Sequence, residues 1–362
     1  MASCWPEMPS LGPYGVPNKT SRDYAQHERS MKVSSNTQPV VLSAVEGVVS
    51  CFSQSLAKEE IQGLAMIRES WRLFLLFFFF LIHSGDAWSQ EHGSDLVQRG
   101  QYIFSLAGGC ACHTVPKGTF NAGARAFPIP LGKVYSTNIT QDKETGLGSW
   151  TDQQIQDAIV KGIRRDGRNI IPVMPYEAYS GMAEEDLKAL IAYLKTLKPV
   201  KKATPELENR APLTRSLGIP TYLKIFGSFS NSPAQAPKSG IERGQYLVEH
   251  VSLCGDCHTP RNFIGVPNRS LYLAGARAKT SPLGEDIPNI TPDKETGIGD
   301  WKREDIAELL LTGTKPDLDN VQGLMAEVIQ GAPHGFKDMR REDALAIADY
   351  LKSIPAIKNK IK

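Results

Sequence analysis

Apolar residues recur at helical spacing in short segments, and long stretches rich in glycine and proline separate these segments. Between residues 186 and 197, for example, the apolar positions include Leu187, Leu190 and Leu194, which share one face of a helix. Glycine and proline clusters favour turns and loops. The pattern therefore predicts an all-α protein, with helices over residues 95–106, 186–197 and 344–354 and a shorter one within 213–226.

The most apolar stretch, Leu73–Ile82, is a different kind of segment. Its ten residues cannot cross the core of a bilayer, which takes about 20 residues in a helix. Arg68 and Arg72 precede the stretch, and the small-residue segment Ala87–Ser89 follows it. A basic flank, a short apolar run and a small-residue exit are typical of a secretory signal peptide. A short buried helix is the alternative.

The predicted signal peptide implies that the N-terminal region is removed during export and is not part of the folded protein. Met66 lies just before the basic flank, so we expect translation to start there and the signal peptide to cover residues 66–89. Cleavage after Ser89 then releases a periplasmic protein. Residues 1–65 are predicted to be an upstream extension that is disordered or absent from the mature protein. A genuine additional N-terminal segment is the alternative.

The chain after the signal peptide repeats itself. The segment Arg99–Tyr102 returns at 243–246, and Asn138–Gly146 returns with one substitution at 289–297. Such self-similarity indicates two copies of one structural unit. We predict two homologous domains, over residues 94–200 and 238–357. A linker rich in proline, serine and lysine, residues 201–237, joins them.

A glycine lies inside the first predicted helix of each repeat. Gly100 and Gly244 occupy equivalent positions, although glycine in a helix interior costs about 1 kcal/mol relative to alanine. A glycine retained in both copies indicates that another helix approaches closely there. Tyr193 and Tyr350, on the last helix of each repeat, are the residues we expect to fill the space.

Charge and cysteine content exclude several classes of protein. The 41 basic and 39 acidic residues nearly balance, whereas a nucleic-acid-binding domain concentrates basic residues. Six cysteines in 362 residues are too few for a disulfide-stabilised scaffold. Four of them lie beyond the signal peptide, and their positions carry the chemistry.

The second repeat contains Cys254-Gly-Asp-Cys257-His258. The spacing C-x-x-C-H is the attachment site of c-type haem. Residues three apart on a helix point the same way, so both thiols can bond one porphyrin edge while the histidine ligates the iron. A redox pair would accompany a βαβ pattern, and a zinc site would need a second ligand pair; neither is visible in this repeat.

The first repeat departs from this pattern because one residue is missing between its cysteines. It contains Cys110, Cys112 and His113 in the order C-x-C-H. Positions two apart on an α-helix point about 200° apart, so both thiols cannot reach one porphyrin edge without local unwinding. Cys112 keeps its place next to the histidine, so we expect it to be the attachment point rather than Cys110. Cys110 either bonds through a distorted turn, stays free or becomes oxidised.

Methionines complete the candidate ligand set. Met174 follows Trp150 by 24 residues, and Met325 follows Trp301 by the same distance. A thioether is a soft, neutral ligand that raises the potential of haem iron. We therefore predict His/Met ligation in both repeats, through His113 with Met174 and His258 with Met325. The matched pair Met182 and Met339 lies just before the last helices and is expected in the core or in the capping region of these helices.

Three other histidines are possible rivals as iron ligands. These are His92, His250 and His334. His250 precedes the second haem motif and His334 follows Met325. Polar side chains are mostly exposed in folded proteins, so we expect each of the three to be a surface residue.

Several segments of the chain resemble class I cytochrome c. The matching segments are Arg243–Val248, Cys257–Asn262 and Met174–Tyr176. More narrowly, they are similar to the cytochrome c subunits that accompany membrane-bound alcohol and gluconate dehydrogenases. The resemblance covers residues 94–357. It implies a set of helices around each haem with the first and last helices crossing, and redox proteins as partners.

Taken together, these patterns predict a dihaem c-type cytochrome that carries electrons in a periplasmic respiratory chain. The electrons would pass from a dehydrogenase to a terminal oxidase or another carrier, with no reaction catalysed by this chain alone. We expect membrane association only through partners or an uncleaved signal peptide. Two alternatives are a haem enzyme of the peroxidase or thiosulfate-oxidising type, and a single-haem cytochrome whose first domain has lost its haem.

Overall fold

The computed structural model describes residues 93–129, 132–209, 213–331 and 333–361. The predicted upstream extension, the signal peptide and His92 lie outside the described residues. Among the helices of the described part, none combines the length and the apolar character needed to cross a bilayer.

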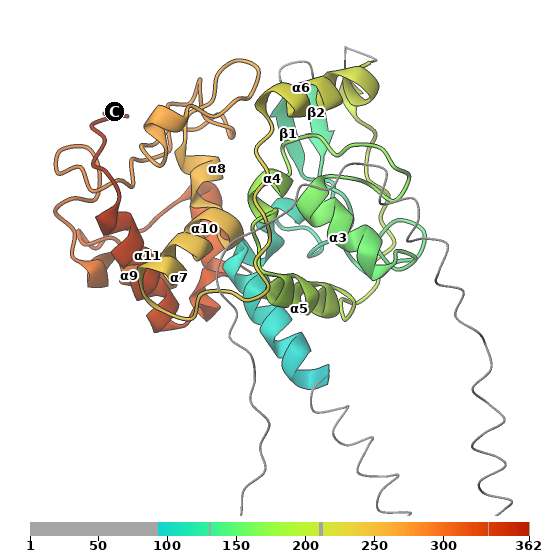
Figure 1. The fold of residues 1–362 in the computed structure, drawn as a ribbon, viewed down its shortest axis with the longest axis horizontal. Coiled ribbons are helices and arrows are strands. Elements are labelled where there is room, and N and C mark those ends of the chain that lie inside the picture. Colours follow the sequence, from blue (N-terminus) through green and yellow to red (C-terminus); the bar gives the residue numbers. More distant parts are fainter. Residues whose placement is uncertain (1–92, 130–131, 210–212, 332, 362) are drawn as a thin grey trace, which may run out of the picture. The chain divides into compact units, whose positions relative to one another are not determined.

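Helices are the main regular structure of the first repeat (Figure 1). The first helix covers residues 93–106 and is drawn in cyan. The elements that follow are the 3₁₀ helix η1 (Gly108–His113), strands β1 (Ala126–Ile129) and β2 (Gly132–Tyr135), and helices α3 (Asp152–Lys161), α4 (Tyr176–Tyr179) and α5 (Glu184–Leu194). The helices predicted near residues 95–106 and 186–197 are confirmed to within a few residues.

The segment between the repeats is more structured than a plain linker. It contains strand β3 (Glu208–Asn209), a π-helical turn η2 (Thr214–Gly218) and helix α6 (Ile219–Phe226), which confirms the short helix predicted there. Ile225 and Phe226 of this helix stay exposed, whereas Ile219 is buried.

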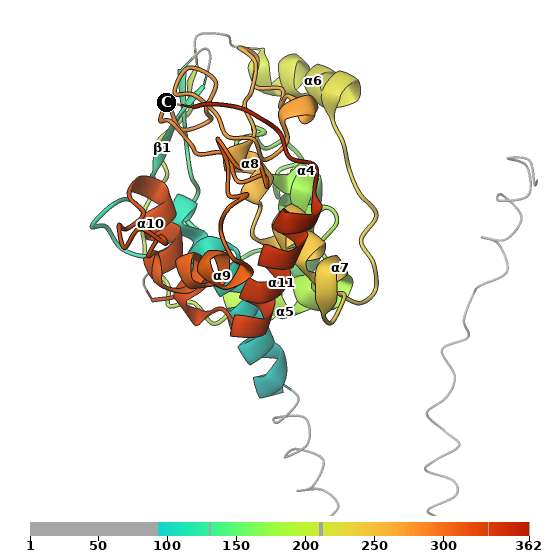
Figure 2. The ribbon, with the colours of Figure 1, turned by 90° about the vertical axis from the view of Figure 1, so that its left-hand side faces the viewer.

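The second repeat contains the remaining helices. They are α7 (Gly240–Tyr246), the π-helical η3 (Leu247–Val251), α8 (Cys254–His258), the 3₁₀ turns η4 (Arg269–Leu271) and η5 (Phe336–Asp338), α9 (Arg303–Thr312), α10 (Gly323–Gln330) and α11 (Arg341–Ser353). Helices α7 and α11 pack side by side, as Figures 1 and 2 show from two directions.

The prediction of an all-α fold is wrong in one detail, because three short strands form an antiparallel sheet in the order β1-β2-β3. Phe127 pairs with Val134, and Lys133 pairs with Glu208 from the segment between the repeats. Valine, isoleucine and aromatic residues favour strands, and here they flank a proline and a glycine. The glycine- and proline-rich segment over residues 126–135, which the sequence pattern indicated as a loop, therefore forms a β-hairpin.

The predicted contact between the first and last helices is confirmed in both repeats. A Cβ added at Gly100 would lie 1.9 Å from the backbone oxygen of Ala189 and 2.8 Å from Cβ of Tyr193. A Cβ added at Gly244 would meet Ala346 and Tyr350 in the same way, at 1.9 and 2.9 Å. Glycine is required at both positions because the backbones touch.

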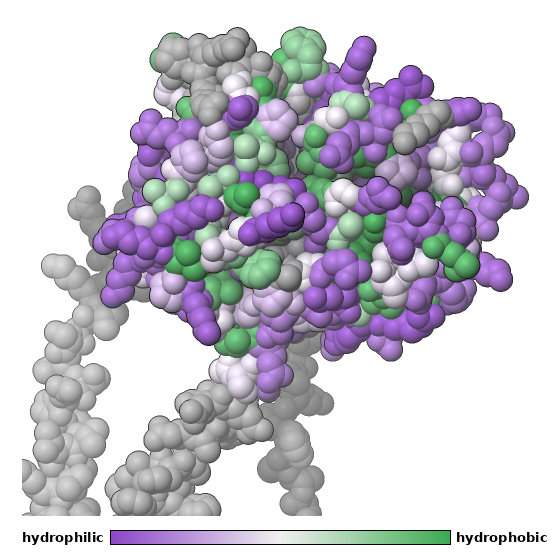
Figure 3. All heavy atoms as spheres, turned by 180° about the vertical axis from the view of Figure 1, so that it is seen from behind, coloured by the Kyte–Doolittle hydropathy of each residue, from purple (hydrophilic) through white to green (hydrophobic). Residues whose placement is uncertain are grey.

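Buried residues of both repeats belong to one continuous apolar cluster. Phe104 and Met182 of the first repeat and Val248 and Ile347 of the second are completely buried within it. Met339 is also buried, so the prediction that Met182 and Met339 are core residues is confirmed. Polar residues dominate the surface seen in Figure 3, with small apolar areas between them.

Candidate haem-binding sites

The second motif forms one short helix. Helix α8 covers Cys254–His258. At about 100° per residue, positions 254 and 257 differ by about 60° around the helix axis, so both cysteines face the same side. Both thiols are half-buried and neither is in a disulfide. This arrangement fits two bonds to one porphyrin edge.

The motif histidines are oriented identically in the two repeats. Nδ1 of His258 lies 2.8 Å from the backbone oxygen of Pro288, and Nδ1 of His113 lies 2.7 Å from that of Thr137. A backbone oxygen can only accept, so Nδ1 carries the proton and Nε2 keeps its lone pair for a metal. Burial lowers the pKa of both histidines. The neutral imidazole that iron ligation needs is therefore the favoured form.

The duplicated Asn-Ile-Thr segment holds the loop that presents these backbone oxygens. Asn289 follows Pro288, and its side-chain amide donates to the backbone oxygen of Ile357 at 2.7 Å. Its carbonyl oxygen accepts hydrogen bonds from the backbone and the hydroxyl of Thr291, at 2.9 and 2.8 Å. Asn138, next to Thr137, makes the equivalent contacts in the first repeat. The repeated sequence thus fixes the groups that orient the histidines.

The first motif adopts a tighter helix than the second. Residues Gly108–His113 form the 3₁₀ helix η1. At 3.0 residues per turn, positions 110 and 112 differ by about 240°, or about 120° the short way, compared with about 160° on an α-helix. The local change is therefore overwinding, not the unwinding that two bonds to one porphyrin edge would require. Cys112 is exposed beside His113.

The thiols of the second motif do not have the character of a redox pair. Burial raises the pKa of Cys254 to about 12. Burial, followed by the neighbouring carboxylate of Asp256, raises the pKa of Cys257 to about 12. Catalytic C-x-x-C cysteines have lowered pKa values because the thiolate is the reactive form. The raised pKa values therefore argue against thiol exchange at this motif.

The two candidate methionine ligands lie in different local structures. Met174 lies in the loop before α4, as predicted, whereas Met325 lies in the first turn of α10 and not in a loop. Both are half-buried and pack against the apolar cluster. The equal tryptophan-to-methionine spacing therefore places Met174 in a loop and Met325 in a helix. The difference arises because Met325 belongs to the apolar segment that forms α10, Gly323–Gln330.

The expectation that His250 and His334 are surface residues is wrong. Nδ1 of His250 lies 2.8 Å from the backbone oxygen of Ala178 in the first repeat. The ring of His334 lies edge-on to the rings of Phe104 and Tyr193, with centroids 6.5 and 6.0 Å away. Both histidines are half-buried between the repeats, a location that helical periodicity within one repeat does not reveal.

Two arginines that the sequence analysis missed hold the motif backbones. Nη1 of Arg125 donates to the backbone oxygen of Ala111 at 3.3 Å and pairs with Glu327 of α10. Nη2 of Arg261 donates to the backbone oxygen of Asp256 at 3.4 Å. The duplication of Gly-Ala-Arg-Ala, at 123–126 and 275–278, was a signal for Arg125, whereas Arg261 has no counterpart.

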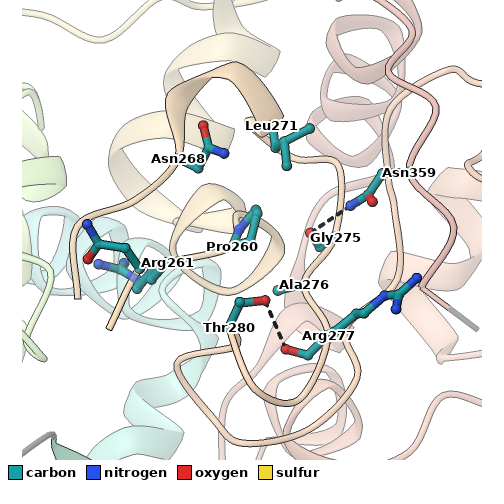
Figure 4. A pocket seen from close by; sticks show the side chains of 10 residues that line it. Pro260, Arg261, Asn268, Leu271, Gly275, Ala276, Arg277, Thr280 and Asn359 are labelled. Atoms are coloured by element: carbon teal, nitrogen blue, oxygen red, sulfur yellow. Dashed lines mark hydrogen bonds between the residues drawn. The ribbon is translucent and has the colours of Figure 1, made fainter. Parts of the chain in front are cut away.

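A small pocket lies beside the second motif and not within it (Figure 4). It has a volume of about 270 Å³ and is lined by the loop that follows His258. The amide of Asn359 donates to the backbone oxygen of Gly275 at 3.4 Å, and the hydroxyl of Thr280 donates to that of Arg277 at 3.1 Å. These bonds, drawn in Figure 4, tie the loop to the C-terminal segment and to itself.

Comparison with known proteins identifies the family. A cytochrome c family model matches residues 97–198. A diheme cytochrome c-type protein of Cereibacter sphaeroides is 36% identical over 270 residues, which make up 72% of this chain and 86% of that protein. The chain belongs to the cytochrome c family. The family model covers the repeat with the shortened motif, so this repeat retains the family's sequence character.

Two further relatives of this cytochrome are subunits of larger enzymes. The fructose dehydrogenase cytochrome subunit of Gluconobacter japonicus is 40% identical over 268 residues, covering 72% of this chain and 53% of that subunit. The cytochrome c subunit of the quinone alcohol dehydrogenase of Gluconobacter oxydans is 32% identical over 312 residues, covering 80% and 61%. The chain thus spans between half and about three fifths of their lengths, and the resemblance to dehydrogenase cytochrome subunits is confirmed.

Proposed function

We propose that this cytochrome is a periplasmic carrier with two c-type haems, built as tandem class I domains over residues 94–200 and 238–357. It accepts electrons from a dehydrogenase and passes them to a terminal oxidase or another carrier. The observation that carries the proposal is the duplicated histidine geometry, in which His113 and His258 both keep Nε2 available for iron. The names of the relatives support a dehydrogenase as the electron donor.

Each residue of the proposed sites has one task. Bound haem would supply an iron that changes between the ferrous and ferric states. His113 and His258 would be the proximal ligands, and Met174 and Met325 the second axial ligands. Cys254 and Cys257 would anchor the second porphyrin by thioether bonds, and Cys112 would anchor the first. The surrounding apolar cluster limits access of water, which keeps the redox centre in a medium of low polarity.

The intact mass of the mature protein tests the number of haems and the cleavage site together. The protein should be expressed with the machinery for c-type haem attachment and exported. We expect a polypeptide starting at Gln90 that carries the mass of two haems. A mass with one haem contradicts the dihaem carrier and favours the single-haem alternative. A polypeptide that retains residues before Gln90 contradicts cleavage after Ser89.

Replacement of Met325 by Leu should abolish the long-wavelength absorption band that sulfur-to-iron charge transfer gives to the second site. Leucine has a similar volume but no ligand atom, so the change isolates ligation from packing. Met174→Leu should do the same at the first site. The matched controls are Met182→Leu and Met339→Leu, at the buried core positions, which should leave the band intact. A band of undiminished intensity in Met325→Leu would remove Met325 from the ligand set, because Met174 accounts only for the first site's share.

A further inference from the structure

Two ion pairs, each with a buried aspartate, occupy equivalent places in the two repeats. In the first repeat, Nε of Arg99 donates to Asp186 at 2.8 Å. In the second repeat, Nε and Nη2 of Arg243 donate to Asp343, both at 2.9 Å. The two aspartates are 1% and 4% exposed. Buried carboxylates need several hydrogen bonds to offset lost hydration, so further donors at these positions matter.

A tyrosine from the opposite repeat supplies the further donor in each case. The hydroxyl of Tyr102, in the first repeat, donates to Oδ2 of Asp343 at 2.6 Å. The hydroxyl of Tyr246, in the second repeat, donates to Oδ2 of Asp186 at 2.7 Å. Each hydroxyl also accepts a hydrogen bond, at 3.1 Å in both cases, from the backbone N–H three residues before its aspartate.

The two tyrosine–aspartate hydrogen bonds between the repeats are reciprocal, as in the interface of a two-fold symmetric dimer. Tyr102 and Tyr246 belong to the duplicated Arg-Gly-Gln-Tyr segment, so one sequence motif supplies both halves. Its arginine pairs with the aspartate of its own repeat, and its tyrosine bonds the aspartate of the other repeat. Rotation or sliding of one repeat on the other would break both tyrosine contacts together.

Other contacts across the same interface involve the haem motifs directly. Arg125 connects the backbone of the first motif to Glu327, two residues after Met325 in the second repeat. The interface therefore joins the first haem motif to α10, the helix that carries Met325 in the second repeat.

We propose that Tyr102 and Tyr246 are positioning residues that fix the two haem sites relative to each other, so that an electron passes directly between them. The inference rests on the proposed dihaem function. The transfer moves one electron, oxidising one iron and reducing the other, and involves no proton. Since the transfer rate depends steeply on distance, a fixed interface determines it.

The test uses the full-length mature holoprotein with Tyr102→Phe, Tyr246→Phe and both changes together. Phenylalanine keeps the ring and removes only the hydroxyl, and each arginine–aspartate pair keeps its partner. Tyr222→Phe, on α6 in the segment between the repeats, is the control. Three readouts are the radius of gyration from X-ray scattering, the distance distribution between the ferric centres from pulsed electron paramagnetic resonance, and electron equilibration after rapid partial reduction.

We expect the double variant to show a larger radius of gyration, a broadened distance distribution and transfer slowed by about tenfold or more. The absorption spectrum of each site should stay unchanged. The single variants, which keep one cross-repeat contact, should lie between wild type and double variant and remain informative where the double variant does not fold.

The inference is overturned if the Tyr102→Phe, Tyr246→Phe and double variants have the same radius of gyration as wild type and the Tyr222→Phe control. Scattering compares variants and wild type at the same haem content, so a preparation with one haem contradicts the proposed function but still tests whether the tyrosines hold the repeats together. A preparation with two haems and unchanged scattering contradicts this inference alone.

Discussion

Replacement of Cys112 by Ala should leave the first site without covalently bound haem, whereas replacement of Cys110 should leave haem attached there. Cys112 precedes His113 directly, as Cys257 precedes His258 in the second motif. One sulfur therefore keeps its relation to the iron ligand. On the 3₁₀ helix η1, the two positions still differ by about 120° around the axis, so a second bond to the same porphyrin edge is disfavoured. Intact mass distinguishes the variants by one haem.

The second motif supplies the matched control. Cys254→Ala leaves Cys257 beside His258 and so reproduces the single attachment we expect at the first site. A haem with one remaining vinyl group absorbs at longer wavelength than one with both vinyls saturated. The unmodified first site should therefore match the second site of Cys254→Ala in its haemochrome spectrum. Loss of the first haem in Cys110→Ala would instead show that the shortened motif uses both of its cysteines.

The contacts within one repeat could be predicted from the sequence because they follow local periods and duplicated residues. The helices around residues 100 and 190 follow from the 3.6-residue spacing of apolar positions. The crossing at Gly100 and Tyr193 follows from a glycine retained in both copies of one helix. The candidate haem ligands follow from motif spacing alone. All of these features involve residues that contact one another at the regular spacing of a helix or recur at equivalent positions in the two repeats.

The contacts between repeats could not be predicted in the same way. Asp343 lies on the apolar-patterned last helix and is buried because Arg243 and Tyr102 donate to it, from positions 100 and 241 residues away. Burial alone would raise the pKa of Asp343, but these hydrogen bonds hold it below its ordinary value. No local pattern identifies such a partner. His250 and His334 were misplaced for the same reason, since the surface of one repeat is the interface with the other.

The sheet was missed for a different physical reason. Strands β1 and β2 are four residues each, too short for the alternation of apolar and polar positions to stand out. Their third partner, β3, lies more than 70 residues further on and contributes only Glu208 and Asn209. Short strands of this kind depend on tertiary contacts, and glycine and proline nearby favour a loop in any local interpretation.

Replacement of Gly100 by Ala should destabilise the protein by about 3 kcal/mol or more, although alanine is the better helix former. The new Cβ would lie 1.9 Å from the backbone oxygen of Ala189 and 2.6 Å from its carbonyl carbon. Backbone atoms cannot turn aside as a flexible side chain can, so the two helices must move apart. That movement would open the apolar cluster where Phe104 and Tyr193 pack, with ring centroids 5.0 Å apart.

The same helix provides the control for this prediction. Gly93 lies at its start with no atom within 4 Å of an added Cβ, so Gly93→Ala should be neutral or stabilise by up to about 1 kcal/mol. Denaturant unfolding of wild type and both variants measures the difference. Gly244→Ala should repeat the loss in the second repeat, because its Cβ meets the backbone oxygen of Ala346 at the same 1.9 Å. A neutral Gly100→Ala beside a destabilising Gly244→Ala would mean that only the second repeat keeps its helices in backbone contact, and that the first has loosened along with its shortened haem motif.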